Sequence, residues 1–141
     1  MLQRLQIPFE VASPQIDEAP QAGEAPADLA QRLALAKAQA VARRFPGAVV
    51  IGSDQVADLD GEPLGKPGTH ARATQQLRQM RGRTVIFQTA VAGGCFDTGG
   101  AQRDVVPVKV KFRDLTDGEI EAYLQAEQPY DCAGSSKSEG L

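Results

Sequence analysis

The chain of 141 residues has no tryptophan, one histidine and two cysteines, and these shortages exclude several kinds of site. Aromatic residues make up only 5% of the chain, so a surface that stacks the bases of single-stranded nucleic acid is not expected. The lone His70 and the separated Cys95 and Cys132 cannot assemble a typical zinc site. Any bound metal would therefore be a hard cation held by carboxylates and by substrate phosphates.

The sequence also lacks a basic excess and a long apolar run. Fifteen basic residues against eighteen acidic ones give a net charge of -3, which argues against a nucleic-acid partner. No apolar run approaches the roughly 20 residues that cross a bilayer, and the N-terminus does not have the pattern of a signal peptide. We therefore expect a cytoplasmic protein with no membrane partner. The length predicts a single domain over residues 1–141.

Apolar patterning predicts strands and helices in a mixed order. Alternation of apolar and polar residues is typical of half-buried strands, and the continuous run at residues 48–52 is typical of a strand covered on both faces of a sheet. Capping residues and helical spacing indicate three helices. We expect strands near residues 5–11, 48–52, 85–91 and 106–112, and helices that begin near Pro26, after Thr69 and after Thr116. The fold class is therefore α/β or mixed α+β.

Asp54 is the sharpest local feature, because it follows the apolar run directly. Open α/β sheets place ligand sites at the carboxyl ends of their strands. A carboxylate at that position could bind Mg²⁺ or orient a water for attack on phosphorus. It could equally begin a turn or accept hydrogen bonds from nearby backbone amides.

Four other segments carry polar groups, and each can be interpreted either as part of a site or as an ordinary structural feature. Lys66 lies between Gly65 and Pro67 and suits a phosphate contact, but it could be an ordinary turn lysine. Asp17-Glu18 could hold a metal or simply be a solvated acidic loop. Lys37, within the first predicted helix, could contact a ligand or face solvent. The loop over residues 134–140 could wrap a polar ligand or be a frayed end.

Taken in order, these segments resemble the Maf family of nucleotide pyrophosphatases, and the resemblance covers essentially all of the chain. The segments that carry it are Ile7–Val11 with Asp17-Glu18, Leu33–Ala40, Ile51–Val56, Leu64–Pro67, Phe112–Leu115, Glu119–Tyr123 and Cys132–Gly134. It implies a twisted mixed sheet with flanking helices and a two-lobed nucleotide cleft. It also makes a homodimer an expectation.

Two positions narrow the resemblance to one branch of the family. Most members have Asp-Thr where this chain has Asp54-Gln55, and a glutamine where it has Glu139. The pair Gln55 and Glu139 resembles the branch that hydrolyses 7-methyl-GTP. Methylation at N7 gives the base a positive charge that a carboxylate would favour, and Gln55 offers both a donor and an acceptor. Ser136 departs from this branch, which usually has an aromatic residue there.

The resemblance also implies roles for single residues. Asp54 would be the catalytic acid–base residue and, with Glu18, would hold a divalent cation, Mg²⁺ or Mn²⁺. Lys37 and Lys66 would neutralise the phosphates of a nucleoside triphosphate, which would be cut to the monophosphate and pyrophosphate.

The chain departs from the family at both ends. Members begin with a strand and a phosphate-binding turn ahead of the point that matches Met1, and they continue beyond the point that matches Leu141. We therefore expect a chain truncated at both ends, with little activity. A non-catalytic nucleotide-binding or regulatory protein, and an inactive remnant, are the alternatives to an enzyme.

Overall fold

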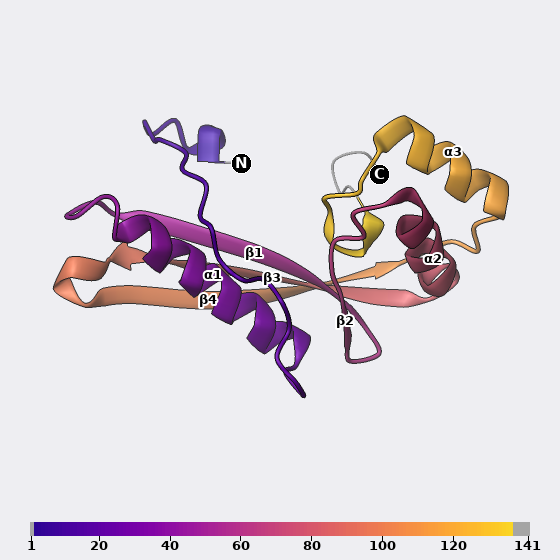
Figure 1. Cartoon of the computed structure of the whole chain (residues 1–141), viewed down its shortest axis with the longest axis horizontal. Helices are drawn as coiled ribbons and strands as arrows, with labels where there is room; N and C mark the ends of the chain where they lie inside the picture. Colours follow the sequence, from indigo (N-terminus) through magenta and orange to yellow (C-terminus); the bar gives the residue numbers. More distant parts are fainter. Residues whose placement is uncertain (1, 137–141) are drawn as a thin grey trace.

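A twisted four-stranded sheet and three α-helices make up the computed structural model, which describes residues 2–136 (Figure 1). The chain is therefore an α+β protein, as expected. Its elements are η1 (Leu2–Leu5), α1 (Pro26–Ala42), β1 (Val50–Leu59), β2 (Glu62–Leu64), α2 (His70–Met80), β3 (Thr84–Cys95), η2 (Phe96–Thr98), β4 (Gly100–Lys111), α3 (Asp117–Glu127) and η3 (Ala133–Ser135). None of the described helices is both long and apolar enough to span a membrane.

The strands follow the order β2-β1-β3-β4, and every pairing in residues 2–136 is antiparallel. The expectation of a mixed sheet is therefore wrong for this part of the chain. For two of the three pairs the reason is the connection, because β1–β2 and β3–β4 are hairpins. Short connections of this kind can join only antiparallel neighbours. The strands β1 and β3, which also pair antiparallel, are joined through β2 and α2.

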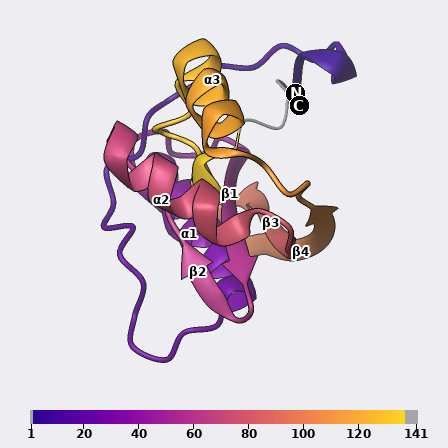
Figure 2. The same cartoon turned by 90° about the vertical axis from the view of Figure 1, so that its right-hand side faces the viewer.

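The helices cover opposite faces of the sheet at opposite ends (Figure 1), and α2 and α3 lie next to each other when seen from their own end (Figure 2). Successive strand residues point to opposite faces. Val56 packs under α1 in one hydrophobic cluster, while its neighbour Ala57 packs under α2 and α3 in another. The covered face of β1 thus changes between these two residues, and the two lobes meet there.

The three predicted helices are confirmed, together with their caps. Pro26 is the first residue of α1, and Thr69 accepts a hydrogen bond from the backbone N–H of Arg72 at the start of α2. Thr116 and Glu119 form the predicted capping box of α3, with both hydrogen bonds at 3.1 Å. Local sequence signals were sufficient here because a cap is made by residues three positions apart.

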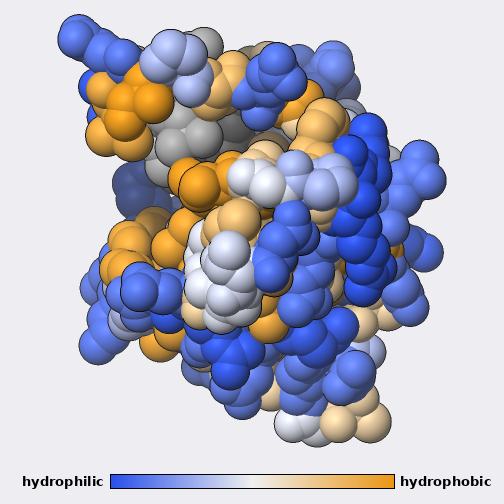
Figure 3. Space-filling view, turned by 90° about the vertical axis from the view of Figure 1, so that its left-hand side faces the viewer, coloured by the Kyte–Doolittle hydropathy of each residue, from blue (hydrophilic) through white to orange (hydrophobic). Residues whose placement is uncertain are grey.

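The N-terminal strand prediction is wrong. Leu2–Leu5 forms a short 3-10 helix, and residues 7–20 have no regular structure. Leu5, Ile7, Phe9 and Val11 are all exposed, and hydrophobic residues are visible at this end of the molecule (Figure 3). A strand needs a hydrogen-bonding neighbour, and no described strand pairs with this segment. Alternation alone therefore does not establish a strand.

The prediction for residues 48–52 is wrong in two respects. The strand begins at Val50 and runs on to Leu59, so Asp54 lies inside β1 and not at its end. The run is also not covered on both faces, because the side chain of Ile51 is 55% exposed. The reason is that α1 covers only one face of this part of the sheet.

The contact between α1 and β1 is unusually close at Gly52. A Cβ atom added at Gly52 would lie 2.4 Å from the backbone oxygen of Ala34 and 2.7 Å from the backbone nitrogen of Ala38. Both alanines are fully buried. Small residues on both elements therefore let the helix backbone approach the strand.

We expect Gly52→Ala to lower the free energy of unfolding by about 1–3 kcal/mol, because the added methyl group overpacks this contact. Urea unfolding measures the change. Gly118→Ala is the matched control, since the nearest atom to its new Cβ is Thr116 Oγ1 at 3.9 Å. Equal stability of the two variants would contradict a tight contact at Gly52.

Candidate functional site

A cleft of about 260 Å³ lies where α1, β1 and the loop after β2 meet. Its walls combine apolar side chains with charged ones from separate parts of the chain. The lining residues are Glu18, Pro20, Leu29, Leu33, Asp54, Gln55, Val56, Pro63, Leu64, Gly65, Lys66 and Ala133. The cleft therefore joins the two lobes and draws on segments more than 100 residues apart.

The central contact of the site is an ion pair between α1 and β1. Lys37 Nζ lies 2.7 Å from Asp54 Oδ1 and donates a hydrogen bond to it. The two side chains are only 17% and 11% exposed. Asp54 points to the face of the sheet that α1 covers, because it is two residues beyond Gly52. The close approach of α1 at Gly52 therefore brings lysine and aspartate together.

Burial changes the proton affinity of this pair. Burial raises the pKa of the Asp54 carboxyl above its ordinary value, although the Lys37 ammonium draws that pKa down. Burial lowers the pKa of Lys37, but the hydrogen bonds and charges of Asp54 and Glu18 outweigh it and leave that pKa raised. Asp54 is thus a stronger base than an exposed aspartate, which suits it to accept a proton.

Glu18 connects the two predicted phosphate-binding lysines. Its Oε1 atom lies 3.1 Å from Lys37 Nζ, and its Oε2 atom lies 3.6 Å from Lys66 Nζ. The neighbouring Asp17 instead accepts a hydrogen bond from the backbone N–H of Ala19. The structure therefore brings four predicted residues into one network of alternating charge, and it distinguishes Glu18 from Asp17.

The two predicted specificity residues stand apart from this network. Gln55 lines the cleft but follows Asp54 on the strand, so its side chain points to the opposite face of β1. There its Nε2 donates a hydrogen bond to Thr89 Oγ1 at 3.0 Å. Glu139 lies outside the described residues.

Asp131 belongs to the charged network but was not among the residues predicted from the sequence. Its Oδ1 atom lies 3.4 Å from Lys66 Nζ, and its side chain is 94% exposed. An acidic residue in a small polar loop is too common to stand out by itself. Only the fold, which brings this loop beside the loop of Lys66, identifies it.

The residue types of this network fit a polyphosphate and a hard cation. Two lysines offer positive charge to phosphate oxygens, and two carboxylates offer oxygen ligands. Within residues 2–136, no group of three or more histidine, cysteine, aspartate or glutamate side chains is placed to hold a metal. Mg²⁺ is usually held in proteins by one or two carboxylates together with substrate phosphates.

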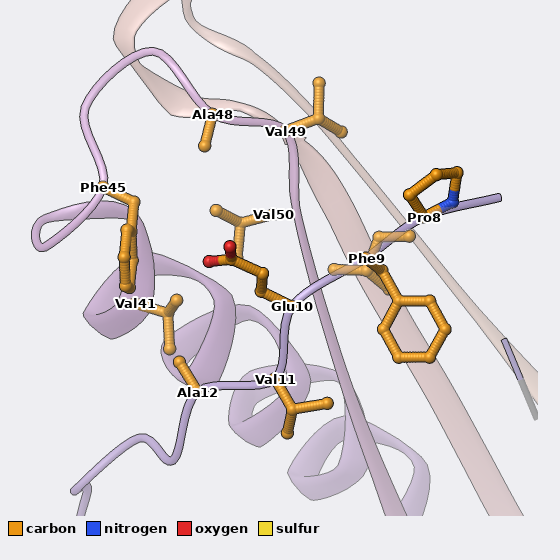
Figure 4. Close-up of a pocket in the computed structure, with 11 residues that line it drawn as sticks. Pro8, Phe9, Glu10, Val11, Ala12, Val41, Phe45, Ala48, Val49 and Val50 are labelled. Atoms are coloured by element: carbon orange, nitrogen blue, oxygen red, sulfur yellow. The ribbon is translucent and has the colours of Figure 1, made fainter. Parts of the chain in front are cut away.

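A second hollow, of about 400 Å³, lies between residues 8–12, the end of α1 and the start of β1 (Figure 4). Glu10 is the only charged residue in its lining. Exposed apolar side chains such as Phe9 and Ile51 make up much of the rest. With one charged group, this hollow does not offer the means to bind a phosphate and a cation together.

A family model described as Maf-like protein matches residues 1–141, which is the whole chain. The chain belongs to the Maf-like protein family. This agrees with the resemblance carried by the sequence segments above, several of which meet in the cleft.

Relatives named 7-methyl-GTP pyrophosphatase match the chain along its full length. A protein of Polaromonas sp. (strain JS666 / ATCC BAA-500) is 72% identical over 141 residues, which are 100% of this chain and 64% of that protein. One of Albidiferax ferrireducens is 68% identical over all of this chain and 71% of its own length. One of Methylobacillus flagellatus is 61% identical, with 73% of its length covered. The chain thus spans about two thirds to three quarters of the length of these Maf-like relatives.

We expect Lys37→Met to move the pKa of Asp54 further upward, because the variant removes the ammonium that stabilises the ionised carboxylate. Carboxyl carbon NMR titration measures this pKa, and Asp54→Asn assigns the signal. Arg32→Met is the matched control, since Arg32 is also on α1 but pairs with Glu24. An unchanged Asp54 titration in Lys37→Met would rule out the pairing described above.

Proposed function

We propose that this Maf-like protein is a nucleoside triphosphate pyrophosphatase that acts on 7-methyl-GTP. The observation that carries the proposal is the half-buried Lys37–Asp54 pair, which lies in a cleft with Glu18 and Lys66. Relatives that are 61–72% identical bear the name of this activity. An ionisable base beside two lysines provides a proton acceptor and positive charge for an attack on a phosphate.

The proposed reaction is an attack of water on the α-phosphorus. The oxygen of water bonds to this phosphorus, the bond from the α-phosphorus to the bridging oxygen breaks, and pyrophosphate leaves with that oxygen. Asp54 accepts the proton of the attacking water, since its raised pKa makes it a better base than an exposed aspartate. The products are the nucleoside monophosphate and pyrophosphate.

The two lysines stabilise the negative charge that spreads over the phosphates. Lys66 has a side chain that is 45% exposed, so a triphosphate can reach it from solvent. Lys37 is more buried and already contacts two carboxylates. Phosphate oxygens would compete with these carboxylates for the lysines, which makes the network a ready-made set of partners for a polyanion.

Glu18 and Asp54 would hold a divalent cation, Mg²⁺ or Mn²⁺, together with the phosphates. Such a cation, when bound, supplies positive charge that polarises the phosphoryl oxygens. Because of these two carboxylates, the cleft carries negative as well as positive charge. This balance favours a substrate that brings its own cation over a bare anion.

Base selection is proposed for Gln55 and Glu139. Gln55 is exposed and lines the cleft, and its amide, whose Nε2 donates to Thr89 Oγ1 in this structure, would offer a donor and an acceptor to a guanine edge. Glu139 would favour the positive charge of the N7-methylated base. A carboxylate at this position gives no advantage to unmodified GTP, so the pair would discriminate between the two nucleotides.

The decisive assay measures pyrophosphate release from 7-methyl-GTP, GTP and dTTP with Mg²⁺ or Mn²⁺. We expect preferential release from 7-methyl-GTP, and a loss of about 100-fold or more in kcat for Asp54→Asn, because the variant removes the base. Asp60→Asn, a surface change near the end of β1, is the matched control. Binding without turnover would indicate a nucleotide-binding protein, and activity that survives in Asp54→Asn would overturn the mechanism.

The pH dependence of kcat/KM offers a separate test. A base acts only when it is ionised, so activity should fall as the pH decreases through the raised pKa of Asp54. We expect this acid limb to lie above the ordinary aspartate value of 3.8. The Asp60→Asn control should have the same limb. An acid limb that persists unchanged in the residual activity of Asp54→Asn would mean that Asp54 is not the base.

A further inference from the structure

Two loops on the α2 side of the cleft are joined through one side chain, that of Gln76. The first loop carries Gly65 and Lys66, and the second runs through residues 130–136. Gln76 Nε2 donates a hydrogen bond to the backbone oxygen of Gly65 at 3.1 Å. Gln76 Oε1 accepts one from Ser135 Oγ at 2.5 Å. Both the nitrogen and the oxygen of the Gln76 side-chain amide are therefore hydrogen-bonded.

The contact with Ser135 satisfies a group that could not reach water. Ser135 is fully buried, and its backbone lies in the left-handed region with a φ of 54°. A buried hydroxyl without a partner costs about 1–3 kcal/mol, and a non-glycine residue in this region persists only when its surroundings hold it. Gln76 provides the side-chain partner that holds Ser135 in this conformation.

The two loops also contact each other through their backbones. The N–H of Gly134 donates to the oxygen of Gly65 at 3.3 Å, and the N–H of Gly68 donates to the oxygen of Tyr130 at 2.9 Å. The oxygen of Gly65 thus accepts from both Gln76 and Gly134. A shift of the Gln76 side chain would therefore disturb the peptide group of Gly65, to which the second loop is also hydrogen-bonded.

We propose that Gln76 is a positioning residue that sets Lys66 and the loop over residues 133–136 relative to each other. This inference rests on the proposed function. Gln76 is not among the residues that line the cleft, so it acts through its partners. Lys66 follows Gly65 directly, and Glu139 follows Ser135 by four residues. One glutamine therefore links the loop of Lys66 to the loop over residues 133–136.

The test compares Gln76→Met with Gln79→Met. Methionine is similar in size to glutamine and adds no charge, but it makes neither hydrogen bond. Gln79 is an exposed glutamine of the same helix, so its variant controls for the change on α2. We expect Gln76→Met to raise the KM for 7-methyl-GTP about 10-fold, with kcat changed less than about 3-fold, because a displaced Lys66 weakens binding before and during the reaction. The preference for 7-methyl-GTP over GTP should fall as well.

Hydrogen–deuterium exchange provides a second measurement that does not depend on activity. We expect faster exchange in Gln76→Met in peptides that cover residues 65–68 and 130–136, and no change in Gln79→Met. Wild-type protein without any turnover would count against the proposed function, and the exchange comparison would still decide the role of Gln76. Unchanged exchange in both segments, or wild-type KM and base preference in an active Gln76→Met, would overturn the inference.

Discussion

The close packing of α1 against Gly52 is the constraint on which the site depends. The fully buried Ala34 and Ala38 flank Lys37 in sequence, and their backbone atoms meet β1 at the residue that has no side chain. Asp54 lies two residues farther along the same face of the strand. The helix therefore cannot move away from the strand without separating lysine from aspartate. A half-buried ion pair at 2.7 Å follows from backbone contact between small residues.

The second constraint is the change of covered face between Val56 and Ala57. Because α1 covers one face and the pair α2 and α3 covers the other, the sheet has no continuous core on either side. The cleft lies where β1 passes from one hydrophobic cluster to the other, and Val56 is part of its lining. A strand that passes from one core to the other can present a buried carboxylate and still leave room for a ligand. The fold thus buries most of the Asp54 carboxylate and still leaves it open to the cleft.

Lys66, Glu18 and Asp131 add the solvent-facing half of the network. They come from loops, and Gln76 is hydrogen-bonded to Gly65 beside Lys66 and to Ser135 in the loop that follows Asp131. The site of this Maf-like protein therefore has one half made by a helix and a strand, and another half made by loops.

The sequence by itself determined the three helices, because Pro26, Thr69 and Thr116 act within a few residues of their own position. It also led to the prediction of Glu18, Lys37, Asp54 and Lys66 as site residues, and the structure places these four side chains in one network. It could not determine that residues 7–11 have no partner strand within residues 2–136, that β1 continues past Asp54, or that Asp131 reaches Lys66. These features were decided only by the tertiary structure, since strand pairing, the covering of a sheet face and the meeting of loops each depend on residues far apart in the chain.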